Sequence, residues 1–345
     1  MSNKEIEKPE AFGPNIWLVD EMFRQYEESP QSVGESWREF FEDYQPQRGG
    51  QPSDGGREVK TEPKATPPDD ARAESKPRAV PEPERKDEGG SEKTGRDDLE
   101  DASPLRGIAA KIAENMEASL EVPTATSVRT IPAKLLEENR RTINRYLAST
   151  KRGKVSFTHI IGWAILKALE DRPAMKAHYD RVDGKPHVVV PKHVNFGLAV
   201  DMERSGQRIL IVPNIKASDE FDFSGFWNAY EDLIHKVRTN ALKPEDYAGT
   251  TMTLTNPGTV GTTQSVPRLV KGQGLIVGTG AISYPGEFEA SDPKMIARMG
   301  VAKLITVTST YDHRVIQGAE SGQFLALIHD LLLEPTASTT RSSRA

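Results

Sequence analysis

One histidine of this chain lies between two opposite charges, where a predicted strand passes into a predicted helix. His313 follows Asp312 and precedes Arg314. The β-branched run before it, residues 302–310, is typical of a strand, and apolar residues recur at helical spacing from Phe324 onward. A neutral imidazole, whose ordinary pKa is about 6.5, is the commonest general base at neutral pH. We therefore predict that His313 is a general base whose charge Asp312 and Arg314 compete to set, although a lone histidine in a turn is more often structural.

The residues around His313 read YDHRVIQG and resemble the Asp-His-Arg-x-x-Asp-Gly signature of the E2 acyltransferases of 2-oxo acid dehydrogenase complexes. Three further stretches extend the resemblance in the order of that family: residues 105–116, 252–258 and 278–282. One position departs from the signature. The family has aspartate four residues after the histidine, and this chain has Gln317.

The resemblance covers residues 104–335 and implies a chloramphenicol-acetyltransferase-like α/β fold, a two-layer sandwich with a mixed sheet. The chain's own pattern agrees, because helical and strand-like segments alternate over this range. We expect helices at residues 134–149, 160–169 and 223–238. We expect strands at residues 122–131, 187–190, 194–200 and 302–310, with 209–213 continuing the same sheet.

The resemblance also implies the roles of three residues. His313 would take the proton of the coenzyme A thiol, and the thiolate would attack a thioester carbonyl. Thr255 would donate its hydroxyl to the developing oxyanion, although by type alone it is an ordinary β-branched strand residue. Gln317 can donate and accept hydrogen bonds, but it lacks the charge with which aspartate holds an arginine. No covalent acyl-enzyme is required, in agreement with a chain that contains no cysteine.

Coenzyme A and a dihydrolipoyl arm are the reactants that the resemblance implies. Nothing before residue 104 has the sequence of a lipoyl domain, so we expect a lipoyl-domain-bearing E2 protein to supply the arm in trans. No Gly-Asp-Gly motif for thiamine diphosphate is present, and E1 decarboxylase activity is not supported. Relatives of this fold form trimers, so we expect a homotrimer in which His313 of one subunit faces Thr255 of its neighbour.

Residues 1–45 are rich in aromatic residues and predict two short helices, the second starting near Ser29-Pro30 or Ser32. This segment resembles the N-terminal motif of 2-oxoglutarate dehydrogenase E1 components, and we expect its aromatic side chains to dock on a partner or on the same assembly. Residues 46–103 contain no aromatic residue and predict a disordered linker. Residues 336–345 form a polar tail. The arrangement resembles the front portion of the fused 2-oxoglutarate dehydrogenases of actinobacteria.

Composition excludes several other classes of function. The net charge of −6 leaves no basic excess with which to bind nucleic acid phosphates. The absence of cysteine excludes disulfides, thiolate nucleophiles and cysteine-based zinc sites. No signal sequence and no apolar run of about 18 residues is present, so we expect no membrane span and a cytoplasmic protein. The other six histidines show no metal-ligand spacing.

We therefore expect succinyl transfer within the 2-oxoglutarate metabolism of the tricarboxylic acid cycle. The choice of succinyl over acetyl rests on the E1-like segment alone. A catalytically silent E2-like module for trimerisation and docking is the alternative, and Gln317 is its strongest support. A thioester hydrolase is a third interpretation, which would require water to enter the site.

Overall fold

The computed structural model describes residues 12, 16–42, 44, 105, 108–204 and 207–334. The described residues up to 44 and from 108 onward belong to one compact unit. The predicted linker at residues 46–103 and the predicted tail at residues 336–345 lie outside the described residues.

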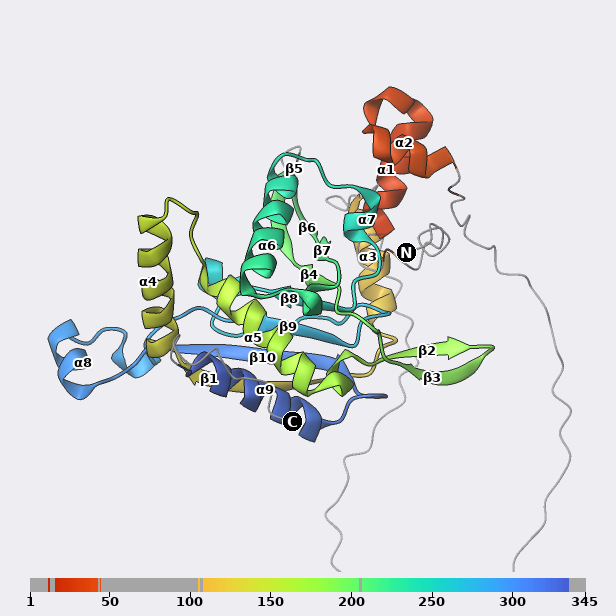
Figure 1. Cartoon of the computed structure of the whole chain (residues 1–345). Helices are drawn as coiled ribbons and strands as arrows, with labels where there is room; N and C mark the ends of the chain where they lie inside the picture. Colours follow the sequence, from red (N-terminus) through yellow and green to blue (C-terminus); the bar gives the residue numbers. More distant parts are fainter. Residues whose placement is uncertain are drawn as a thin grey trace, which may run out of the picture. The chain divides into compact units, whose positions relative to one another are not determined.

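A six-stranded mixed sheet forms the centre of this unit (Figure 1). Its order is β1-β10-β9-β8-β4-β7, in which β8 runs parallel to β9 and to β4 while the other neighbours are antiparallel. The strands are β1 (Thr124–Pro132), β4 (Phe196–Leu198), β7 (Asn214–Ile215), β8 (Met252–Thr255), β9 (Leu275–Thr279) and β10 (Leu304–Asp312). This sheet confirms the predicted α/β class with a mixed sheet.

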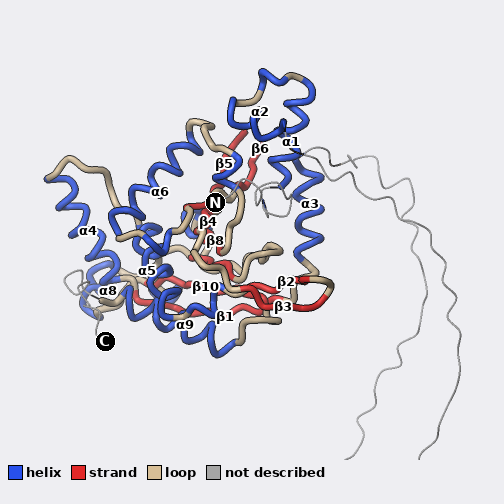
Figure 2. The backbone as a smooth tube through the Cα atoms, turned by 45° about the vertical axis from the view of Figure 1, so that its right-hand side comes forward, coloured by secondary structure: helices blue, strands red, loops and turns tan. Residues whose placement is uncertain are grey.

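Helices cover one face of the sheet. Because side chains alternate along each strand, every second residue of a strand points toward these helices. Ile305, Val307 and Tyr311 of β10 share one buried core with residues of α5 and α9, and Figures 1 and 2 show α9 running alongside β1 and β10. Ser309, on the same side, accepts a hydrogen bond from Ser321 of α9 (2.9 Å). The helices are α3 (Ile108–Ser119), α4 (Lys134–Ser149), α5 (Phe157–Asp171), α6 (Phe223–Arg238), α7 (Pro244–Tyr247), α8 (Pro293–Met299) and α9 (Gly318–Leu332).

Two small antiparallel sheets lie outside the main one. β2 (His178–Val182) pairs with β3 (Lys185–Val189), and β5 (Val200–Arg204) pairs with β6 (Gln207–Ile211). The prediction that residues 209–213 continue the main sheet is therefore wrong, and the predicted strand 194–200 is divided between β4 and β5. Alternation of side chains predicts that a segment is a strand, but it does not say which strand lies beside it.

The N-terminal segment folds into two helices, as predicted: α1 (Ile16–Glu28) and α2 (Glu35–Glu42). α2 begins after Gly34, whose carbonyl oxygen accepts the N–H groups of Trp37 (3.0 Å) and Arg38 (3.1 Å). The predicted start near Ser29-Pro30 or Ser32 is wrong, because Pro30–Ser32 forms a separate 3-10 turn.

The aromatic side chains of this segment pack on the same chain. Trp37 donates its indole N–H to the carbonyl oxygen of Leu242 (3.3 Å), and its ring lies 6.3 Å from that of Tyr247. Ile209 and Ile211 of β6 belong to the same buried cluster. The docking expected of these aromatic residues is thus intramolecular in this structure.

Among the described residues, no helix is long and apolar enough to cross a membrane.

Candidate active site

His313 occupies the turn between the end of β10 and the start of α9, as predicted. Its backbone N–H donates to the carbonyl oxygen of Pro123 (2.9 Å), which ties the turn to the segment before β1. Its ring lies edge-to-face against buried Tyr311, with the centroids 5.7 Å apart, and the residue is exposed. The imidazole is therefore accessible at one end of the sheet while its backbone is held.

Asp312 and Arg314, the charged neighbours of His313, form an ion pair with each other. Arg314 Nε lies 2.9 Å from Oδ1 of Asp312, and Nη2 lies 2.6 Å from Oδ2. The backbone N–H of Arg314 also donates to Oδ1 (3.0 Å). Hydrogen bonding to Asp312 raises the pKa of Arg314 above its ordinary value. The two charges neutralise each other and brace the turn.

Thr255 ends β8, and the chain does not bring it to His313. Thr255 pairs with Gly278 of β9, and Gly278 pairs with Thr308 of β10. His313 lies five residues beyond Thr308 and past the end of the strand. At about 3.3 Å per residue, the two side chains are on the order of 16 Å apart along the sheet. One copy of the chain therefore presents His313 at one end of the sheet and Thr255 toward the other.

The two motif stretches, residues 252–258 and 278–282, lie directly against each other. A Cβ atom on Gly258 would overlap the carbonyl group of Gly280, so the two backbones approach this closely only because residue 258 is glycine. Asn256 donates its side-chain N–H to the hydroxyl of Thr158 (2.9 Å). Thr158 belongs to the first turn of α5, so this helix fixes the end of β8 next to Thr255.

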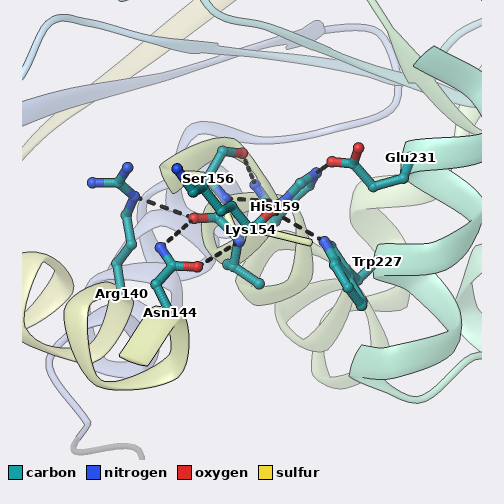
Figure 3. A network of polar contacts seen from close by, with 8 residues as sticks. Arg140, Asn144, Lys154, Ser156, His159, Trp227 and Glu231 are labelled. Atoms are coloured by element: carbon teal, nitrogen blue, oxygen red, sulfur yellow. Dashed lines mark hydrogen bonds and ion pairs between the residues drawn. The ribbon is translucent and has the colours of Figure 1, made fainter. Parts of the chain in front are cut away.

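Figure 3 shows the polar network that holds the start of α5. The Ser156 hydroxyl accepts the backbone N–H of His159 (3.2 Å), and His159 Nδ1 accepts the backbone N–H of Ser156 (3.0 Å). Asn144 of α4 makes two bonds to the backbone of Val155, at 2.9 and 2.7 Å. These reciprocal bonds satisfy backbone groups that a helix start leaves unpaired.

His159 is buried and neutral in this network. Burial lowers the pKa of His159 from 6.5 to about 4. Its ring lies 4.1 Å from that of Tyr230, and Nε2 lies 3.2 Å from Oε1 of Glu231. Because the unfolded chain binds a proton between these two pH values and the native state does not, the free energy of unfolding falls as the pH falls through this window.

We expect His159→Gln to remove this part of the pH dependence, because glutamine can also accept the N–H of Ser156 at this position of the capping motif. The wild type should lose up to about 3 kcal/mol of unfolding free energy from pH 6.5 to 4 through this group. Urea unfolding of both proteins at several pH values measures the difference, in which the shared carboxylates cancel. An identical slope in the two proteins would contradict the assignment.

Gln317 stands directly before α9 and is exposed. Its backbone N–H donates to the carboxylate of Glu320 (2.8 Å), and its carbonyl oxygen accepts the N–H of Ser321 (3.2 Å). His313 and Gln317 thus share one turn, whereas Thr255 lies elsewhere.

Sequence reasoning did not find the Pro123 carbonyl or the Thr158–Asn256 bond, since neither residue type carries a signal of its own. In the part of the chain that the structure describes, no group of three or more acidic or histidine side chains could hold a metal ion.

The chain matches two protein families and is similar to several known proteins. Residues 98–339 match the family described as 2-oxoacid dehydrogenases acyltransferase (catalytic domain), and residues 10–48 match the family described as 2-oxoglutarate dehydrogenase N-terminus. The multifunctional 2-oxoglutarate metabolism enzyme of Mycobacterium sp. (strain KMS) is 45% identical, over 94% of this chain and 29% of its own length. That of Mycolicibacterium vanbaalenii is 46% identical, over 95% of this chain and 28% of its own. The chain thus spans less than a third of these relatives.

Solved acyltransferase cores share the fold. A probable dihydrolipoamide acetyltransferase from Listeria monocytogenes superposes with a TM-score of 0.57 and 22% identity, covering 70% of this chain and 97% of that one. The Azotobacter vinelandii dihydrolipoamide acetyltransferase gives a TM-score of 0.55 and 23% identity, covering 67% and 90%. The Azotobacter structure was determined to investigate the role of a serine, a histidine and an asparagine in the catalytic mechanism of that enzyme, and the asparagine lies four positions after the histidine.

Proposed function

Because the chain belongs to the family of 2-oxoacid dehydrogenase acyltransferases, we propose that it transfers a succinyl group from a dihydrolipoyl arm to coenzyme A. The observation that carries the proposal is the exposed His313 on the turn between β10 and α9, inside the matched residues 98–339. The succinyl group is supported by the match of residues 10–48 to the 2-oxoglutarate dehydrogenase N-terminus and by the names of the mycobacterial relatives.

The dihydrolipoyl arm is, in this proposal, carried by another protein of a 2-oxoacid dehydrogenase complex. Residues 46–103 contain no aromatic residue and few aliphatic residues with which to build the core of a small β domain. The arm would then reach His313 from outside this chain. Assembly into a multienzyme complex is supported by the family, since one structural neighbour is the cubic core of the pyruvate dehydrogenase multienzyme complex.

The mechanism needs a base and an oxyanion donor. A thiol with a pKa of about 8.5 is mostly protonated at neutral pH, and the imidazole of His313 removes its proton. The thiolate of coenzyme A attacks the carbonyl carbon of the succinyl-dihydrolipoyl thioester, and the hydroxyl of Thr255 donates to the resulting oxyanion. Collapse of this intermediate forms succinyl-coenzyme A, and the departing dihydrolipoyl sulfur takes the proton back from the imidazolium.

Two copies of the chain must meet to complete this site. His313 and Thr255 are about five residues apart along the sheet within one chain, which is too far for both to touch one thioester carbonyl. We propose a closed trimer in which His313 of one copy faces Thr255 of the next, because cyclic symmetry then makes every site equivalent.

An amide at position 317 fits this activity. The Azotobacter acetyltransferase has an asparagine at the same spacing from its histidine, so an amide there accompanies catalysis in that protein. Glu320 supplies a carboxylate to the same turn through its bond to the N–H of Gln317 (2.8 Å). The proposal therefore favours an active transferase over a silent module.

We expect Gln317→Asp to keep or raise the transfer rate and to change the free energy of unfolding by no more than about 1 kcal/mol. Aspartate is a favourable residue before a helix, and its repulsion from Glu320 offsets part of that gain. Chemical denaturation and steady-state rates measure the two effects. Loss of activity would show that the turn is built around a neutral side chain.

A thiol-balanced assay tests the function itself. The full chain is mixed with dihydrolipoamide and either succinyl-coenzyme A or acetyl-coenzyme A, and free coenzyme A is followed by chromatography. Transfer leaves the total thiol concentration unchanged, whereas hydrolysis raises it. We expect transfer to be faster with succinyl than with acetyl. Absence of transfer with both would favour the silent module, and rising thiol would favour the hydrolase.

A further inference from the structure

A residue outside the acyltransferase signature contacts the turn that carries His313. His313 itself is exposed, and its backbone is held by one hydrogen bond, to Pro123. The residue on each side of it belongs to the Asp312–Arg314 pair, in which the aspartate side chain is 3% exposed and the arginine side chain is 31% exposed. The conformation of the turn therefore depends on what keeps the Arg314 guanidinium in place.

Tyr179 of β2 covers that guanidinium. Arg314 Cζ lies 3.9 Å from the centroid of the Tyr179 ring, close enough for a cation–π contact. The guanidinium is therefore held along one edge by the carboxylate and across one face by the ring. Tyr179 and Asp312 thus select one conformer of Arg314 together.

The β2–β3 ribbon that carries Tyr179 is anchored at the same point as the turn. A Cβ atom on Gly274 would overlap the carbonyl oxygen of Ala177, so the residue before β2 lies directly against the start of β9. The carbonyl oxygen of Gly274 in turn accepts the backbone N–H of Asp312 (3.3 Å). Gly274 therefore connects the base of the ribbon to the last residue of β10.

We infer that Tyr179 is a positioning residue for His313, which it reaches through Arg314 and Asp312. It touches neither substrate nor the reacting atoms. Its ring keeps Arg314 in the conformer that closes the turn, and the closed turn holds the backbone from which the imidazole projects. The inference deepens the proposed function and rests on it for the kinetic part of its test. The other part of the test needs no activity.

The test compares Tyr179→Leu with Tyr179→Phe in the full chain. Leucine removes the aromatic face, and we expect kcat to fall about three- to tenfold, while KM for coenzyme A stays within about twofold. Phenylalanine keeps the face and should retain the wild-type kcat. The matched control is Val188→Ala, which alters the exposed cross-strand neighbour of Tyr179 on the same ribbon and leaves the cation–π contact.

Amide hydrogen exchange provides the second readout, at the backbone N–H groups of His313 and Arg314 that are bonded to Pro123 and Asp312. Exchange at these groups should be faster in Tyr179→Leu than in Tyr179→Phe or Val188→Ala. Equal exchange and equal kcat in all three variants would overturn the inference, and so would equal losses in Tyr179→Leu and Val188→Ala. If the leucine variant does not fold, Tyr179→Met replaces it. If the wild type transfers no acyl group, the proposed function fails and the exchange comparison still decides the role of Tyr179.

Discussion

Replacing His313 with alanine is expected to lower kcat of succinyl transfer by about 10²- to 10⁴-fold, which is the usual contribution of a general base. The fold should survive, because His313 is exposed and its hydrogen bond to the carbonyl oxygen of Pro123 uses the backbone N–H that alanine keeps. Steady-state kinetics with coenzyme A and a succinyl thioester measure the loss. Circular dichroism and thermal unfolding check that the structure is unchanged.

The matched control for this variant is His235→Ala. His235 is also an exposed histidine, and it lies in the last turn of α6, away from the turn at His313. Its replacement should leave kcat at the wild-type value. Near-full activity in His313→Ala would refute the base mechanism. The oxyanion role of Thr255, which is proposed as part of that mechanism, would then lose its basis.

Mixing the two inactive variants His313→Ala and Thr255→Ala is expected to restore activity. If each site takes its histidine from one subunit and its threonine from the next, random exchange of equal amounts places two wild-type groups together at about one site in four. The mixture should therefore reach about a quarter of the wild-type rate, starting from two proteins that are each nearly inactive. The measurement is the transfer rate before and after subunit exchange.

Two observations would contradict the shared site. A mixture that stays inactive after proven exchange would show that each chain completes its own site. A monomer in light scattering would remove the idea earlier. Thr255→Ser serves as the control, because it keeps the hydroxyl and should remain active alone, whereas Thr255→Ala leaves β8 without an oxyanion donor at this position.

The sequence by itself determined the elements whose signals are local. Helices at residues 134–149 and 223–238 have the predicted bounds, because amphipathic spacing is a property of neighbouring residues. The strand, turn and helix around His313 also follow from adjacent residues: a β-branched run, a charged turn and a helical apolar pattern. The E2-type resemblance implied the role that we propose for His313 and marked Gln317 as the departure.

The tertiary structure alone decided which distant residues meet. Strand pattern did not show that β6 pairs with β5 outside the main sheet, since alternation is the same for either neighbour. Nor did it show that Asp312 holds Arg314, or that Tyr179 stacks on that arginine across more than a hundred residues of sequence. The separation of Thr255 from His313 follows from the register of three strands. Register and stacking depend on how separate segments pack together, and no local pattern of residues encodes that packing.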